Sequence, residues 1–350
     1  VTNTAGISVI NSSATLDITP PNYTVLFEVF FEKSYKLGDY ALVAQLKNTP
    51  DADGYLYFDI SSVLEAECKA ALDEPVVPVW DTTDSIPGNN LRRFYIRYTE
   101  SYGAPIMAQD WEYDEVRTCM NGGISQSLFA LGDWFDGLDV DNALLTWMPD
   151  GRTVGMNQPE FIAFYNWDAV ARSVFVRVRW YDIADNSIST PEGKLTALEL
   201  APGEVAYLPV GPEVMGMGAH DAAYKYQVQV VYNGVDAYEP LSQWRTYYLD
   251  RDYYHSNRYI QYRNGFGTPE CWRCTGVFAK RIDIQRSIAE LPLLAGATEY
   301  SADRFQFAAS FKNQYTYRTG YMRRIDAEAL QELLVSGEVY DVSATDRKSV

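Results

Sequence analysis

Apolar and polar residues alternate along several stretches of the chain. In residues 173–181 the apolar side chains fall at every second position, at Val174, Val176, Val178 and Trp180. Residues 91–99 alternate in the same way. A period of two is typical of strands with one buried face, so the pattern predicts a mainly β protein.

The first group of strand-like runs predicts a β-sandwich over residues 23–115. Its strands are expected at residues 23–31, 40–46, 55–60 and 91–99. Gly54 closes a turn after residues 51–53. A short helix is expected over residues 63–72, capped by Ser61 or Ser62. Short strands with turn signals about every 8–12 residues are typical of sandwiches.

The flanking residues are less regular. Residues 1–22 are rich in Thr and Ser and end at Pro20 and Pro21, which predicts an N-terminal arm. Residues 116–157 are expected to be loops and short strands that bridge two domains. The chain begins without Met and stops after a strand-like run, so we expect a processed start and a longer natural chain.

Residues 158–250 predict a second β-sandwich, and residues 251–350 predict a mixed β/α domain. Strands of the second sandwich are expected at residues 160–167, 173–181, 195–200, 205–208, 224–232 and 243–249. The last domain is expected to have strands at residues 258–262, 274–284, 304–311 and 339–342. Its helix is expected to start with Asp326 as the N-cap, to carry an apolar stripe and to end near Gly337.

Charge is distributed unevenly along the chain. The net charge is −18; residues 1–150 carry 23 acidic and 8 basic side chains, and residues 151–350 carry 24 and 21. This split favours contact between the acidic end of one subunit and the more basic end of a neighbour. The alternative is that the acidic residues only keep the protein soluble. The negative charge disfavours nucleic acid as a partner. With 27 Tyr residues, the chain also suits protein–protein contact. No apolar run of about 18 residues predicts membrane insertion.

The sequence gives little sign of catalysis. His220 and His255 are the two histidines, and no nucleophile elbow, P-loop or zinc-protease motif is present. Glu112, Asp114 and Glu115 beside Trp111 could form a weak glycosidase-like cluster. We therefore predict that the protein is not an enzyme.

Cysteine and aspartate clusters raise the question of metals. Cys271 and Cys274 form a CxxC pair that could bind a metal, form a disulfide or remain as two thiols, and the sequence favours the thiols. No second pair is present to complete a zinc site. Four carboxylates in one loop predict a calcium site at Asp133, Asp136, Asp139 and Asp141. A solvated acidic turn is the alternative. Apart from this calcium, no cofactor is predicted.

Four segments carry a family resemblance. Residues 50–64, with the sequence PDADGYLYFDISSVL, resemble a fibronectin/immunoglobulin-like module in tail proteins of bacteriophages and prophages of Bacteroidetes. Residues 262–267, 319–322 and 330–340 resemble later parts of such proteins. The resemblance covers about a quarter of the chain. It implies two immunoglobulin/fibronectin-like sandwiches before the mixed domain, and a role in a virion with no catalytic residues.

These observations together predict a structural protein of a phage tail tip, baseplate or fibre, or of a related extracellular particle. Its expected partners are copies of itself and other particle proteins, and a host surface receptor or glycan is a further candidate. The alternative is a cell-surface adhesin or glycan-binding module. An acid-dependent glycoside hydrolase is the third hypothesis. Virion or extracellular localisation follows from the first hypothesis.

Overall fold

The mainly β fold class is confirmed by a computed structural model, in which antiparallel sheets form layers and helices are few. The structure describes residues 2–3, 7–9, 21–33, 36–50, 56–70, 85–88, 90–120, 122, 141, 143–233, 238–290, 304–336, 339–343 and 346–349. In this part of the chain, no helix has the length and apolar character needed to cross a membrane.

The first sheet has seven strands in the order β1-β10-β7-β3-β4, with β8 and β9 also paired to β7. They are β1 (Thr2–Asn3), β3 (Thr24–Glu32), β4 (Tyr40–Asn48), β7 (Leu91–Tyr102), β8 (Met107–Ala108), β9 (Glu112–Tyr113) and β10 (Arg117–Met120). Helix α1 (Ser61–Ala70) packs on one face together with β5 (Tyr57–Asp59), which pairs with β2 (Ile7–Val9). The predicted alternation in β7 is confirmed, because Phe94 and Ile96 are buried in this core.

Helix α1 begins at Ser61, earlier than predicted. Ser61 and Ser62 therefore lie inside the helix, and neither is its N-cap. The carboxylate of Asp59 instead accepts a hydrogen bond from the backbone N–H of Ser61 at 2.9 Å. An acceptor at this point satisfies one of the free N–H groups at the helix start.

The second sandwich packs a six-stranded sheet on a three-stranded one. The larger sheet contains β11 (Arg152–Gly155), β13 (Arg172–Tyr181), β14 (Glu192–Leu200), β16 (Lys225–Asn233), β17 (Tyr238–Pro240) and β18 (Arg245–Asp250). The smaller sheet contains β12 (Phe161–Tyr165), β15 (Val205–Pro209) and β6 (Ile86–Pro87). The alternating face of β13 is buried between them as predicted. A 3-10 turn, η1 (Met217–Ala219), lies between β15 and β16 in the chain.

The third sheet has the order β20-β19-β23-β24. Its strands are β19 (Arg258–Arg263), β20 (Pro269–Cys274), β23 (Val339–Ser343) and β24 (Asp346–Ser349). Helices α3 (Arg324–Ala329) and α4 (Gln331–Val335) pack against its apolar face. The predicted N-cap was wrong: Arg323 takes that position, and Asp326 lies in the first turn, where it accepts hydrogen bonds from Arg323.

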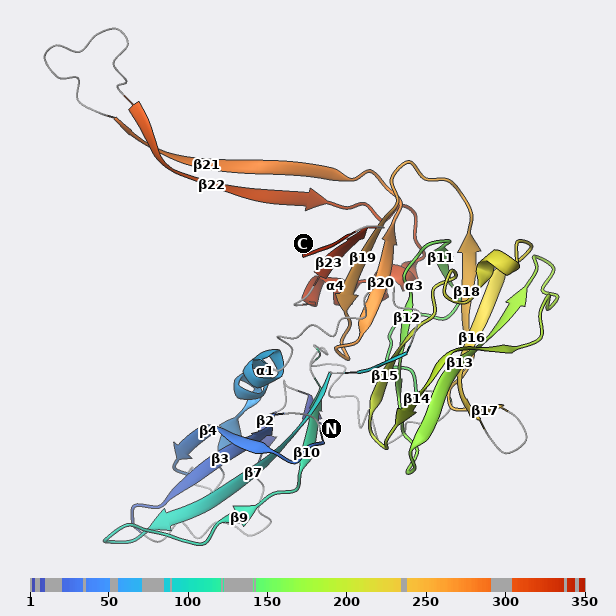
Figure 1. The fold of residues 1–350 in the computed structure, drawn as a ribbon. Coiled ribbons are helices and arrows are strands. Elements are labelled where there is room, and N and C mark those ends of the chain that lie inside the picture. The colour runs from blue at the N-terminus through green and yellow to red at the C-terminus, as the bar shows by residue number, and fades with distance from the viewer. Residues whose placement is uncertain are drawn as a thin grey trace, which may run out of the picture.

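A long hairpin leaves this third unit. Strands β21 (Ala279–Glu290) and β22 (Arg304–Thr316) form a separate two-stranded sheet that projects away from the body (Figure 1). The run predicted as one strand at residues 274–284 is divided, because β20 ends at Cys274 and β21 starts at Ala279.

Candidate assembly surfaces

The hairpin of β21 and β22 stands alone among the described strands. The two strands pair in antiparallel register from Ala279 opposite Thr316 to Glu290 opposite Arg304, with a bulge between Ser287 and Ile288. Neither pairs with any other strand in the described residues. Both faces of this ribbon are therefore open along most of its length.

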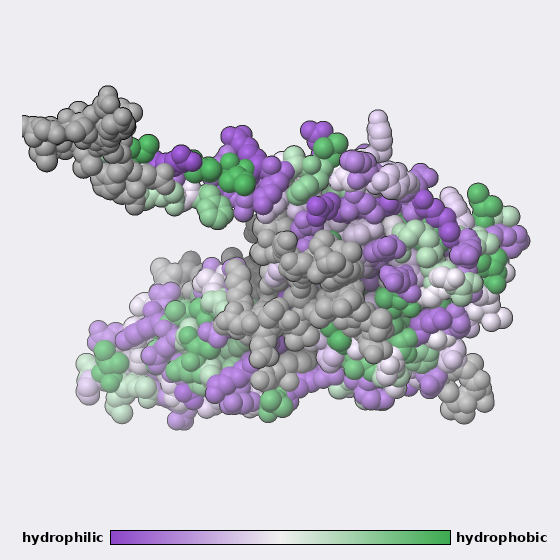
Figure 2. Space-filling model, turned by 45° about the horizontal axis from the view of Figure 1, so that its top comes forward, coloured by the Kyte–Doolittle hydropathy of each residue, from purple (hydrophilic) through white to green (hydrophobic). Residues whose placement is uncertain are grey.

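One face of the hairpin, its apolar face, carries large apolar side chains with Arg286 among them. Ile284 lies opposite Phe311, and Ile282 and Ile288 follow on the same side of β21. These four side chains are 53–72% exposed. Figure 2 shows hydrophobic side chains among hydrophilic ones along the hairpin. Large apolar groups in water favour burial against a partner.

The other face of the hairpin is polar. Asp283 and Gln285 lie on it, with Arg281 forming an ion pair to Asp283 at 2.7 Å. The two strands together carry five basic residues and two acidic ones. The hairpin is thus amphipathic and basic, although the whole chain is acidic.

The base of the hairpin is fixed to the third unit. The backbone N–H of Gly276 donates to the carbonyl of Arg318 at 2.8 Å. A Cβ at Gly276 would lie 2.5 Å from the Cβ of Arg318, so this close approach requires glycine. The ring of Tyr317 contacts that of Phe278 in a tilted arrangement, and its hydroxyl donates to Asp341 at 3.0 Å. These contacts set the direction in which the hairpin projects.

The outer face of the first sheet carries stacked aromatic rings. Tyr95 of β7 stacks on Phe30 at 4.8 Å between ring centroids and also contacts Tyr40 and Tyr113. The guanidinium of Arg97 lies 4.3 Å from the centre of the Trp111 ring. Cation–π contact of this kind holds an exposed aromatic group in place.

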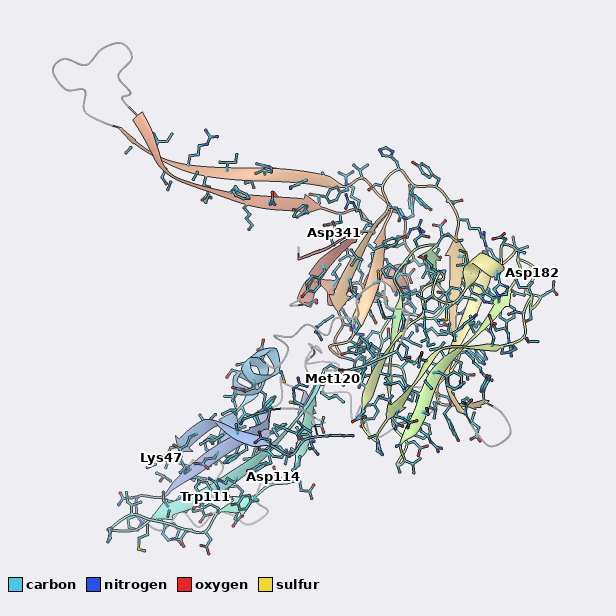
Figure 3. All side chains as sticks on the ribbon, in the orientation of Figure 1. Lys47, Trp111, Asp114, Met120, Asp182 and Asp341 are labelled. Carbon is cyan, nitrogen blue, oxygen red and sulfur yellow. The ribbon has the colours of Figure 1, made fainter. Side chains whose placement is uncertain are left out.

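Exposed apolar and acidic side chains lie along the segment from β8 to the start of β10. Ile106, Met107, Tyr113 and Val116 are exposed. Glu112, Asp114 and Glu115 lie in the same segment, and Trp111 and Asp114 both appear on this lobe in Figure 3. Of the predicted glycosidase-like acids, Glu112 accepts from the hydroxyl of Tyr98, and Asp114 forms an ion pair with Arg117 at 2.6 Å. The lobe thus presents an acidic surface with exposed apolar groups.

The two histidines lie in unlike environments. His220 stacks on Trp180 at 5.1 Å between ring centroids, and its Nε2 lies 3.8 Å from Glu192. His255 is exposed. Trp180 is fully buried and belongs to the core of the second sandwich.

The predicted calcium site falls almost entirely outside the described residues. Asp133, Asp136 and Asp139 are not described, and Asp141 is exposed. Among the described residues, no group of three or more His, Cys, Asp or Glu side chains has the arrangement of a metal site. Calcium binding by the loop stays a prediction.

The CxxC pair lies in a strand, and this geometry decides between the three hypotheses. Cys271 pairs with Gln261, whereas Cys274 pairs with Arg258 and packs in the apolar core of the third unit. Residues three apart in a strand point to opposite faces and have Cα atoms about 10 Å apart. Such a pair can neither share a metal ion nor form a disulfide. Both cysteines are therefore buried thiols, and burial raises the pKa of Cys274 to about 12.

A buried polar network joins the second and third units, and no sequence pattern predicts it. Arg152 donates to Glu160 at 2.9 Å and to the carbonyl of Cys271. Burial raises the pKa of Glu160 to about 7, with Arg152 opposing the shift. Glu270 accepts from Tyr262 at 3.0 Å. Each carboxylate is held by protein donors, which is typical of a structural network.

No protein-family model matches the chain, and no curated protein is similar to it in sequence.

Proposed function

We propose that this chain is a non-enzymatic structural protein of a phage tail tip, baseplate or fibre, or of a related extracellular particle. It acts by docking to other copies of itself and to other particle proteins. The observation that carries the proposal is the hairpin of β21 and β22, where one face presents exposed Ile282, Ile284, Ile288 and Phe311. A two-stranded ribbon is at best marginally stable alone in water, so a partner that covers its apolar face would stabilise it.

Charge and shape indicate what this partner is. The hairpin is apolar and basic, and the lobe around β8 and β9 is apolar and acidic. The two surfaces lie on separate projections of the same chain (Figure 1). Contact between the hairpin of one copy and the acidic lobe of the next would join unlike surfaces. Such head-to-tail contacts close into rings or extend as filaments.

A pair of double variants tests the proposal. Ile284→Ser with Phe311→Ser removes two exposed apolar groups from one face. Gln285→Ser with Gln314→Ser is the matched control on the polar face. The first should weaken self-association by at least about tenfold, because a buried Ile or Phe contributes about 1.5–3 kcal/mol.

Molar mass measured by light scattering over a range of concentrations gives the result. We expect the wild type and the control to assemble alike and the apolar-face variant to stay monomeric. A wild type that remains monomeric at every concentration, or an apolar-face variant that assembles normally, would refute docking between copies.

The stacked rings around Tyr95 and Trp111 favour a second candidate, a glycan-binding adhesin. Half-exposed aromatic rings are suited to stacking on sugars, although here the rings also contact one another and Arg97. Glycan binding at this face would be unaffected by the hairpin variants, which separates the two functions.

A further inference from the structure

Two cysteines that are distant in sequence meet in the core of the first unit. Cys68 lies in the last turn of α1, and Cys119 lies in β10. Their Sγ atoms are 3.6 Å apart, and the two residues are 1% and 0% exposed. The sulfur atoms are therefore in contact, with no other group between them.

The placement of both thiols follows from the local structure. Cys68 is one helical turn after Leu64, so both side chains face the sheet and both are buried in the same core. Cys119 lies opposite Arg92 of β7, on the side of the sheet that α1 covers. Contact between the two sulfur atoms is thus a consequence of how α1 packs on the sheet.

We propose that Cys68 and Cys119 are a redox site that forms a disulfide between α1 and β10. A disulfide has an S–S distance of about 2.05 Å, so the sulfur atoms must approach by about 1.5 Å, which is within reach of side-chain rotation. The oxidant is a small disulfide such as oxidised glutathione. Two protein thiols and one small disulfide give one protein disulfide and two small thiols.

The surroundings indicate the order of the steps. Contact with the Cys119 thiol and the nearby positive charge of Arg92 lower the pKa of Cys68, although burial opposes this. Cys68 lies on α1, the element whose opening admits the oxidant, so its thiolate attacks the small disulfide and releases the first small thiol. Cys119 then loses its proton, attacks Cys68 in the mixed disulfide and releases the second. Because both sulfur atoms are buried, the oxidant gains access when α1 opens locally.

The disulfide would hold β10 in place, a strand near the edge of the first sheet. β10 pairs with β7 on one side and with the two residues of β1 on the other, where Thr2 lies opposite Cys119. A disulfide would connect α1 directly to this strand and close a loop of about 50 residues, which restricts the unfolded chain. Oxidation would therefore stabilise the first unit against opening.

Cys271 and Cys274 provide a control within the same chain. Both are buried, yet they lie on opposite faces of β20. If closeness in sequence decided which cysteines form a disulfide, the oxidant would link Cys271 to Cys274. The structure assigns disulfide formation to the pair that is distant in sequence instead.

The test is peptide mapping by mass spectrometry, without reduction, after the folded chain is incubated with oxidised glutathione. We expect a cross-linked peptide joining Cys68 and Cys119, with the mass reduced by two hydrogens, while Cys271 and Cys274 are alkylated after denaturation. The oxidised chain should melt at a higher temperature, and a reductant should reverse the shift. A Cys68→Ala with Cys119→Ala variant should show no such shift.

Stable glutathione adducts on Cys68 without a cross-link, or alkylation of both Cys68 and Cys119 after oxidation, would overturn the proposal. A cross-link between Cys271 and Cys274 under the same conditions would overturn it as well. The mass map needs only wild-type protein, so it gives a result even where the double variant does not fold.

Discussion

The carboxyl group of Glu332 lies where α4 meets the third sheet. Burial raises its pKa to about 8, and the negative charge of Glu270 adds to this shift. The folded state therefore binds a proton that the unfolded chain releases near pH 4.5. Stability from this proton is present at low pH and is lost as the pH rises from about 4.5 to about 8.

We predict that Glu332→Gln removes this part of the pH dependence. The wild type should lose several degrees in melting temperature between pH 5 and pH 8, and the variant should lose less. At pH 8.5 the variant should melt above the wild type, since an amide carries no charge to bury. Thermal unfolding followed by circular dichroism across this pH range measures the difference. Parallel curves for the two proteins would show that Glu332 is ionised in the folded state near its ordinary pKa.

At the scale of single elements, the hairpin combines an ordered base with an open shaft. Its base is held by the Gly276 contact and by Tyr317, whereas the shaft contacts water on both faces. Most side chains of the shaft are exposed, so they add little to the free energy of unfolding of the body. The element is thus suited to binding and contributes little to the core.

Removal of the shaft is expected to leave the body intact. Deletion of residues 285–310, with Ile284 joined to Phe311 by Asn-Gly, closes the remaining strands with a two-residue turn. The melting temperature should change by less than about 2 °C, which corresponds to under about 1 kcal/mol for a chain of this size. Differential scanning calorimetry measures it. A drop of many degrees would mean that the shaft stabilises the body and is not a free binding element.

The hairpin of β21 and β22 also shows which features of the fold the sequence can predict. The strands of the two larger layers were predicted because one buried face gives a period of two, as in β13. The hairpin has the same period, and nothing in it indicates that its apolar face lacks a partner. The division at Gly276 was missed for the same reason, because local alternation continues across it.

The candidate sites were harder to predict, because they depend on contacts between distant residues. The CxxC spacing suggests a chelate only if the chain turns between the two cysteines, and here it is extended. Cys68 and Cys119 are 51 residues apart, so spacing gave no reason to pair them. Arg152 and Glu270 meet only when the second and third units pack together. Fold class follows from local pattern, but these sites follow from tertiary packing.

At the scale of the whole molecule, opposite charges lie on different projections. The first 150 residues hold most of the excess negative charge, and the projecting hairpin carries excess positive charge. The two parts lie on separate projections (Figure 1). Attraction between copies would therefore orient the encounter before the apolar surfaces meet.

Self-association should weaken as salt is raised. Raising sodium chloride from about 0.1 M to about 1 M shortens the Debye length from ~10 Å to ~3 Å, which screens the attraction between hairpin and acidic lobe. The dissociation constant, measured by analytical ultracentrifugation, should rise. An association that is equally tight or tighter in high salt would indicate that apolar contact alone holds the copies together, with no contribution from attraction between the hairpin and the acidic lobe.

One short strand determines how the molecule would respond to pulling. β6, at residues 86–87, lies between strands of the first sheet in sequence but is paired with β15 of the second sandwich. The neighbouring Gly88 donates to the carbonyl of Val205 at 2.7 Å. A pulling force applied to the first lobe would therefore reach the second sandwich through the hydrogen bonds between β6 and β15, and not only through a flexible linker. The lobes would resist separation until those bonds ruptured, a mechanical property that suits a component under strain.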